Sequence, residues 1–524
     1  MQPQFPLQVL SKQLIKPATP TPQNLRELKI SSLDQYELPI YVPYLFCYPL
    51  QDKTQSSERS KQLQNSLSQI LTLFYPLAGR YIEDKLLIHC NDYGVEYVEA
   101  TIASHIAPIL EKNFDSKHVH HLIPHQHESS RSPLVAVQCN MFECGGIALG
   151  LCVSHRIVDG FVYSKFIDAW SSLCRLGFDK VENRPSFDLG LLLPTRETMP
   201  EIKDVFPNLP KLQIASATFV FDKLSMSKLR SKLGNRDNNS RMQLVAALIW
   251  KALIRMAESK HGKLKPSVIT LLMNMRRRTT KALPISEDSC GNFTRPVMVK
   301  FKPEKERKKV EFHELVGLIS KAISNAVSDC AKAQNGDEIF LMVDRAWSEA
   351  AEECNREEVE SYFFTSTCRL PFYPDYGWGK PVRVMRVQSF PEEIVLLMDT
   401  SDGDGIEAWI CLDEKDMPFF QQDPDIIAFT SQVERHNHSQ LQGLALELTF
   451  RDACDACDGA ALERQLPYGD ACGACDDGAA LELELELQLT FCLTAQTSRR
   501  TPCMAAFLLP VLLVLPHDSA ATGH

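Results

Sequence analysis

The chain of 524 residues is too long for a single hydrophobic core, so we expect at least two domains. Hydrophobic residues make up 44% of it and charged residues 23%, which is typical of a globular protein and excludes wholesale disorder, collagen and a polytopic membrane protein. The net charge of −10 excludes the broad basic surface that nonspecific nucleic-acid binding requires, and we expect no nucleic-acid partner.

Residues 1–188 mix helix and strand patterns and are predicted to form an N-terminal domain. The predicted helices span Ser60–Leu73 and Phe161–Leu176, and the predicted strands span Leu134–Phe142 and Ile147–Val153. The sequence Cys-Gly-Gly between the two strands indicates a hairpin. A proline-rich stretch without periodicity follows at 189–216 and is predicted to be a crossover linker.

Residues 217–433 are predicted to form a second domain of similar size. Its predicted elements are strands and helices in alternation, over Thr218–Asp222, Met242–Met256, Val268–Met273, Glu311–Ala333 and Ile394–Met398. The mixture of both kinds of element predicts an α/β or α+β protein in two lobes.

Residues 434–524 differ in composition and are predicted to be a disordered, low-complexity extension. The segment Asp452–Glu463 nearly recurs as Asp470–Glu482, and alternating Leu and Glu follow. The pairs Cys454-x-x-Cys457 and Cys472-x-x-Cys475 have the spacing of a structural zinc site. A duplication produces the same spacing without any metal, so a zinc module remains only the alternative and no metal site is predicted.

Eleven of the seventeen cysteines lie before Glu434, scattered mainly through apolar runs, as reduced thiols of a cytoplasmic protein do. The N-terminus lacks a basic region followed by an apolar stretch, so no secretory signal is expected. The most apolar stretch, Met504–Leu515, is shorter than the roughly 20 residues that span a bilayer. We therefore predict a cytoplasmic location and no membrane partner.

The clearest chemical signal is Cys-Val-Ser-His-Arg-Ile-Val-Asp-Gly-Phe, between a predicted strand and a predicted helix. His155 at the strand end is placed to project into a cleft, where an imidazole can take up and return a hydroxyl proton. Asp159 can orient that ring or turn away and anchor the loop to a cation. The same pattern also fits a buried histidine with a capping aspartate. Ser154 points to the opposite strand face, so it is not expected to meet His155, and Cys152 is expected in the core.

Two further segments are dense in chemically distinctive residues. The run Asp375-Tyr-Gly-Trp-Gly-Lys-Pro381 predicts tight backbone around an anchored aromatic side chain, in a structural turn or beside a ligand channel. Three arginines in Asn274-Met-Arg-Arg-Arg278 follow a predicted strand and can bind phosphate, pair with a buried carboxylate or form a solvated charge run.

Together these segments resemble the BAHD family of plant acyl-CoA-dependent acyltransferases, over roughly Leu7 to Val433. That family shows His-x-x-x-Asp in mid-chain and Asp-Phe-Gly-Trp-Gly about two hundred residues later. Further matching segments are Leu33–Gln35, Phe74–Arg80, Phe142–Gly146, Asn274–Arg278, Gly291–Phe293 and Asp404–Trp409. The similarity is greatest to the vinorine synthase-like branch, which acetylates alkaloid and terpenoid alcohols.

The resemblance implies a two-domain, chloramphenicol acetyltransferase-like fold of mixed sheets with flanking helices and an active-site channel between the domains. His155 would be the general base, and Asp159 would pair with Arg278 or, as second choice, Arg276. The loop of Asp375, Tyr376, Gly377, Trp378 and Gly379 would line the CoA side. Thr365, Thr367 and Asn292 would border the acceptor or the oxyanion. Acetyl-CoA would be a co-substrate of a monomer that binds no cofactor and no metal.

Two departures and two rivals accompany the resemblance. Tyr376 stands where the family has Phe, and Thr367 stands where relatives carry a Trp beside the reaction centre. A condensation-type peptide synthase has a similar motif but two adjacent histidines, whereas here Ser154 precedes His155. A relative that binds without catalysis would not need His155 and Asp159. The predicted activity is therefore O-acyl transfer, most simply O-acetyl transfer, to an alkaloid or terpenoid alcohol, triterpenoids and limonoids included.

Overall fold

The structure is a computed structural model that describes residues 5–111, 116–125, 132–181, 184–197, 199, 213–234, 239–280, 283, 285–303, 309–387 and 393–437. The side chains of residues 431–437 are not described. The two cysteine pairs of the predicted extension, and residues 200–212 of the predicted linker, lie outside the described residues.

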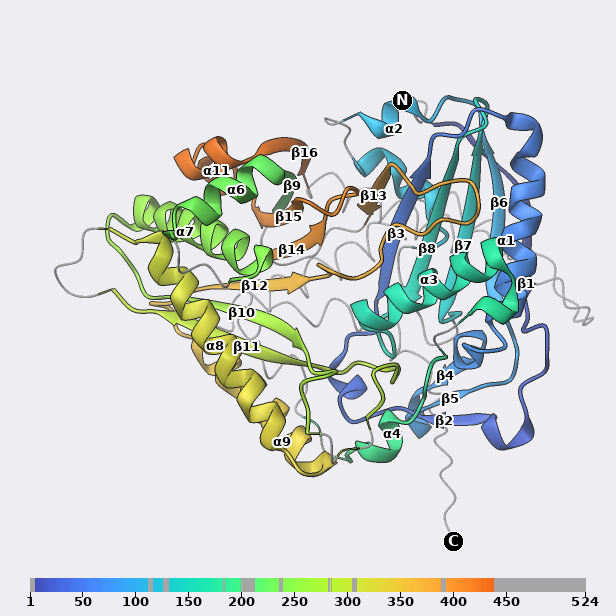
Figure 1. Ribbon diagram of the computed structural model, residues 1–524, viewed down its shortest axis with the longest axis horizontal. Coiled ribbons are helices and arrows are strands. Elements are labelled where there is room, and N and C mark those ends of the chain that lie inside the picture. Colours follow the sequence, from blue (N-terminus) through green and yellow to red (C-terminus); the bar gives the residue numbers. More distant parts are fainter. Residues whose placement is uncertain are drawn as a thin grey trace, which may run out of the picture.

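A six-stranded sheet forms the first lobe (Figure 1), with the strand order β1-β6-β7-β8-β3-β13. Its strands are β1 (Leu7–Ile15), β3 (Tyr41–Tyr48), β6 (Val95–Ile102), β7 (Val135–Phe142), β8 (Ile147–Ser154) and β13 (Arg383–Arg386). All neighbours are antiparallel except β6 and β7. A small antiparallel sheet of β2 (Glu27–Lys29), β5 (Leu87–His89) and β4 (Arg80–Ile82) lies below it in the view of Figure 1.

Both faces of the first sheet are covered, which explains why all eight residues of β3 are buried. The side chains of Tyr44, Phe46 and Tyr48 join a core with α1 (Ser56–Ile70) and α3 (Gly160–Leu176). Leu45 and Cys47 point to the opposite face, whose core includes residues of α2 (Ala107–Leu110) and of the 3-10 helix η6 (Ser116–Leu122). The alternation along β3 follows from the two-residue period of a strand.

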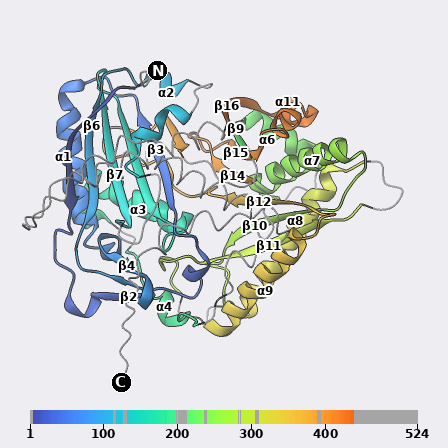
Figure 2. The same ribbon diagram turned by 180° about the vertical axis from the view of Figure 1, so that it is seen from behind.

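A seven-stranded mixed sheet forms the second lobe, with the order β11-β10-β12-β14-β15-β9-β16. Its strands are β9 (Ile214–Phe221), β10 (Ser267–Asn274), β11 (Thr294–Phe301), β12 (Glu360–Ser366), β14 (Ile394–Asp399), β15 (Ile406–Asp413) and β16 (Ser431–Asn437). Helices pack on it around one large core (Figure 2). They are α6 (Lys223–Ser231), α7 (Arg241–His261), α8 (Phe312–Lys332), α9 (Gly336–Cys354), α10 (Met417–Gln421) and α11 (Pro424–Phe429).

The two lobes are joined by a strand that crosses from one to the other. Strand β13 comes from the second half of the sequence, yet it pairs with β3 at the edge of the first sheet. The short helix α4 (Leu189–Leu192) lies between the lobes, and the residue after it, Leu193, is buried in the core of the second lobe. Residues 383–386, which belong to the predicted second-domain segment 217–433, thus complete the sheet of the first lobe.

The predicted helices and strands all form, with ends shifted by a few residues. The predicted hairpin is the antiparallel pair β7 and β8, closed by Gly145 in a left-handed backbone conformation, φ 88°. Helix α7 extends past the predicted Met256 to His261, because Gly262 caps it at φ 69°. Residues 434–437 of the predicted extension instead belong to β16. Among the described residues, no helix has the length and apolar character to cross a membrane.

Candidate active site

His155 directly follows β8, at the junction of the two lobes. Its backbone N–H donates to the Ile40 carbonyl at 2.8 Å, and its own carbonyl accepts from Asn292 Nδ2 at 2.9 Å. Ile40 comes just before β3, whereas Asn292 precedes β11 of the second lobe. The backbone of His155 is thus held from both lobes, while its side chain remains 29% exposed.

A carboxylate faces the imidazole of His155, and it is not that of Asp159. Glu37 Oε2 lies 3.1 Å from His155 Nδ1. This nitrogen is buried, and among the described residues no hydrogen bond of regular geometry reaches it. Burial raises the pKa of Glu37, and the charges of Asp34 and Asp159 act in the same direction, whereas His155 lowers it. Sequence reasoning missed Glu37, although it lies only two residues beyond the segment Leu33–Gln35.

Asp159 points away from His155 and is 4% exposed. Its Oδ1 accepts from the Val162 N–H at 2.9 Å, which caps the N-terminus of α3. Its Oδ2 accepts from Arg276 Nη1 at 2.7 Å and from the Phe293 N–H at 3.1 Å. The carboxylate therefore joins α3 to two segments of the second lobe, the anchoring alternative of the two that the sequence left open.

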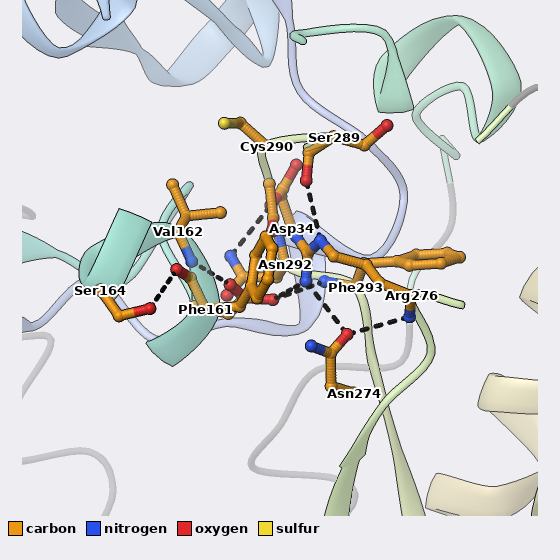
Figure 3. Close-up of polar contacts among 12 residues, drawn as sticks. Asp34, Phe161, Val162, Ser164, Asn274, Arg276, Ser289, Cys290, Asn292 and Phe293 are labelled. Atoms are coloured by element: carbon orange, nitrogen blue, oxygen red, sulfur yellow. Dashed lines mark hydrogen bonds and ion pairs between the residues drawn. The ribbon is translucent and has the colours of Figure 1, made fainter. Parts of the chain in front are cut away.

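Arg276, not Arg278, is the partner of Asp159, so the expected preference for Arg278 is wrong. Arg276 Nε donates to the Ser289 carbonyl and Nη2 to the Gly291 carbonyl, each at 2.8 Å. Figure 3 shows its guanidinium among these groups, with the Phe161 ring centre 4.5 Å from Cζ. The chain turns after Arg276, because Arg277 has φ 63° and the Arg278 N–H bonds to the Met275 carbonyl at 3.0 Å. Arg278 Nη1 consequently reaches the Asn274 carbonyl instead.

Asn292 links the first lobe to the second through Asp34. Its backbone N–H and its Nδ2 both donate to Asp34 Oδ1, at 2.7 and 2.9 Å, and Nδ2 also donates to the His155 carbonyl. The Ser31 N–H and Oγ each donate to Asp34 Oδ2 at 2.8 Å. The side-chain amide of Asn292 thus donates within this network, and its expected place bordering the acceptor or the oxyanion stays a prediction.

Of the two threonines expected near the acceptor, Thr367 lies beside the His-x-x-x-Asp motif. Its methyl carbon would be 3.4 Å from a Cβ on Gly160, the first residue of α3. Its N–H donates to the Leu397 carbonyl at 2.8 Å. Thr365 is on β12, paired in register with Leu396 of β14.

The Asp375–Gly379 loop is tightly built and attached to α3. Asp375 Oδ1 accepts from the N–H groups of Gly377 and Gly379 at 2.8 and 2.9 Å, and both glycines have positive φ, 106° and 95°. The buried Tyr376 ring packs edge-on against Trp170 of α3, with centroids 5.0 Å apart. This loop leads directly into β13, so it also positions the strand that joins the lobes.

A small pocket of about 50 Å³, partly open to solvent, lies between the two sheets. Residues of β3 and β13 line one side of it and residues of β9, β14 and β15 line the other, among them Tyr44, Arg386, Thr218, Leu396 and Glu407. Burial raises the pKa of Glu407 to about 7, although Arg383 opposes the shift. His155 is not among the residues that line this pocket.

Among the described residues, no group of three His, Cys, Asp or Glu side chains is placed to hold a metal ion.

Comparison with known proteins decides the family. The sequence model of the Transferase family matches residues 5–427. The chain belongs to the BAHD family of acyltransferases. Stemmadenine O-acetyltransferase from Catharanthus roseus is 34% identical over 80% of this chain and 96% of its own length. Limonoid 21-O-acetyltransferase from Melia azedarach is 33% identical over 81% of this chain and 98% of its own.

A solved structure of this family has the same architecture. The crystal structure of vinorine synthase superposes with a TM-score of 0.69 at 31% identity, covering 81% of this chain and 99% of that chain. The predicted fold class, a mixed α/β structure in two domains, is thereby confirmed.

Within this BAHD chain, the seven buried and four half-buried cysteines of the described residues are all free thiols. Burial raises the pKa of Cys152 to about 12, so its thiol is not a nucleophile at neutral pH.

Proposed function

We propose that this BAHD chain transfers an acetyl group from acetyl-CoA to a hydroxyl of a plant specialised metabolite, with His155 as general base. The observation that carries the proposal is the position of the His155 imidazole. It stands at the junction of the lobes, its Nδ1 is buried beside Glu37, and the side chain is 29% exposed. The edge of the ring that carries Nε2 is then the one that a substrate can reach.

The proposed reaction follows from the chemistry of a thioester. Nε2 of His155 takes the proton of the acceptor O–H, and the alkoxide oxygen forms a bond to the thioester carbonyl carbon. The C–S bond of the tetrahedral intermediate then breaks, and the imidazolium returns its proton to the CoA sulfur. Both substrates must be bound together, because holding the reacting atoms in place supplies much of the rate enhancement.

Alkaloid and terpenoid alcohols, limonoids included, are the proposed acceptors. The names of two relatives, an acetyltransferase for stemmadenine and one for a limonoid, support an acetyl donor and acceptors of this kind. Thr365 and Thr367 are the proposed borders of the acceptor region, on the ground that Thr367 lies against the start of α3. The Asp375–Gly379 loop is proposed as scaffold on the CoA side, which agrees with its internal hydrogen bonds.

Replacement of the proposed base provides the test. His155→Ala is expected to fold normally and to lose about 10²- to 10⁴-fold in turnover, the usual contribution of a general base. The assay incubates acetyl-CoA with a panel of alkaloid and terpenoid alcohols and measures both free CoA and product mass.

A second histidine of the chain serves as the matched control. His261 at the end of α7 has a carboxylate, that of Glu360, 3.0 Å from its Nε2 and a side chain that is 34% exposed. His261→Ala should therefore keep wild-type turnover. Normal turnover of His155→Ala would refute the assignment of the base.

A further inference from the structure

The motif of this chain leaves the imidazole of His155 without the carboxylate that lies nearest in the sequence. Both oxygens of Asp159 are occupied by the cap of α3, by Arg276 and by the Phe293 N–H. An imidazole that no neighbouring group orients can adopt two tautomers and several orientations. In the proposed reaction, only the form with a lone pair on Nε2 can accept the substrate proton. A group that faces Nδ1 would select the productive form.

We propose that Glu37 is the positioning residue for His155, holding its Nδ1 edge so that Nε2 carries the free lone pair. The inference rests on the proposed function of His155 as base. Glu37 Oε2 is 3.1 Å from Nδ1, and Nδ1 is buried. A carboxylate accepts hydrogen bonds only, so its presence at this nitrogen favours the tautomer with the proton on Nδ1.

The surrounding network fixes the position of the Glu37 carboxylate relative to the His155 ring. Glu37 ends the 3-10 helix η2 (Asp34–Tyr36), where its N–H donates to the Asp34 carbonyl at 3.2 Å. The Asp34 side chain binds Asn292, which also holds the His155 carbonyl. On the other side, the Tyr36 hydroxyl donates to Asp344 of α9 at 2.5 Å. The same groups therefore fix the backbone on both sides of the contact between Glu37 and His155.

The contact also stabilises the imidazolium that forms during the reaction. Its distance is that of an ion pair, and catalytic contacts of this kind commonly shorten once charge develops.

Other charged groups near His155 are compensated or oriented elsewhere. The charge of Asp159 is balanced by Arg276, and Asp34 accepts hydrogen bonds from Ser31 and Asn292. The guanidinium of Arg156 lies over the Tyr81 ring, with Glu83 at 3.4 Å. Glu37 is consequently the charged group that faces the imidazole of His155.

Kinetics of Glu37→Gln test the proposal against Glu37→Asp. For Glu37→Gln we expect kcat to fall about 10- to 100-fold with the KM for acetyl-CoA changed less than about threefold. Glu37→Asp should recover most of the rate. Glu83→Gln is the control, because this carboxylate is 65% exposed and neighbours Arg156 rather than the ring. Its kcat and its KM for acetyl-CoA should equal those of the wild type.

A measurement on the wild-type protein covers the case in which Glu37→Gln does not fold. Histidine ¹⁵N chemical shifts, with the His155 signal identified by its loss in His155→Ala, report which ring nitrogen carries the proton. A neutral ring protonated on Nδ1 supports the proposal. A neutral ring protonated on Nε2, or a wild-type kcat in folded Glu37→Gln, overturns it. If His155→Ala is inactive in either of these cases, the proposed function stands and only the role of Glu37 fails.

Discussion

At the scale of single residues, the buried ion pair of Asp159 and Arg276 decides how the two lobes hold together. Asp159→Ala would leave the guanidinium, whose side chain is 2% exposed, without its counter-charge. Removing one partner of a buried pair costs about 3–5 kcal/mol. We expect a melting temperature lower by several degrees and a loss of soluble protein at least as marked as the loss of turnover.

Arg278→Ala is the control for this prediction, because Arg278 is bound to a backbone carbonyl instead of a carboxylate. Its melting temperature should change much less than that of Asp159→Ala, as measured by differential scanning fluorimetry. A stable, folded Asp159→Ala protein without activity would show instead that Asp159 acts directly in catalysis.

The hydroxyl of Tyr376 is a second local feature with a measurable consequence. It is buried, and in the part of the chain that the structure describes it has no hydrogen-bond partner. A buried unpaired polar group destabilises a fold, so Tyr376→Phe should leave the free energy of unfolding unchanged or raise it by up to about 1 kcal/mol. Tyr48→Phe is the matched control, since the Tyr48 hydroxyl donates to the Pro374 carbonyl at 3.0 Å. It should lower stability by about 1 kcal/mol, and the reverse order of the two melting temperatures would contradict the argument.

At the scale of elements, an ion-pair cluster fastens α11 to α7. Lys251 and Arg255 of α7 lie 3.0 and 2.8 Å from Asp425, and Arg255 Nε donates to Asp423 at 2.8 Å. Burial would raise the pKa of Asp425, but the two cations hold it at about 2, below the ordinary value of 3.8. The pairing thus stabilises the fold above pH 4, and this contribution is lost as the pH falls from about 4 toward 2.

Asp425→Asn should therefore lower the free energy of unfolding by about 2 kcal/mol at pH 7, the value that a shift of this size implies. The difference in melting temperature from the wild type should be constant between pH 7 and 5 and should narrow below about pH 4. A difference that is the same at pH 3 and pH 7 would show that the charge of Asp425 contributes nothing to stability.

At the scale of the whole molecule, the described fold and the family match end close together. The family model ends at residue 427 and the last described strand, β16, ends at Asn437. A chain that stops after Asn437 should therefore keep the melting temperature and turnover of the full chain. As control, a chain that stops after Thr430 loses β16 and leaves one edge of β9 unpaired, so it should melt lower.

The same pair of chains addresses the cysteine pairs that resemble a zinc site. Elemental analysis of the purified full chain should find no stoichiometric zinc. Zinc present in the full chain and absent from the chain that stops after Asn437 would establish the alternative, a metal-binding extension.

The sequence alone predicted the mixed fold, nine of its elements, the family and the position of His155 in the chain. Hydrophobic periodicity predicts elements such as α7, and the capping residues Ser240 and Gln243 mark where this helix begins. It did not predict the short strand β13, because four residues carry too little pattern and their partner, β3, is remote in the chain.

Tertiary structure alone decided which side chains meet His155 and Asp159. The choice of Arg276 over Arg278 depends on the left-handed backbone of Arg277, a conformation that three consecutive arginines do not reveal. The approach of Glu37 depends on Asp34 and Asn292, which belong to different lobes. Contacts between segments far apart in sequence are produced by packing, and no local preference of the chain encodes them.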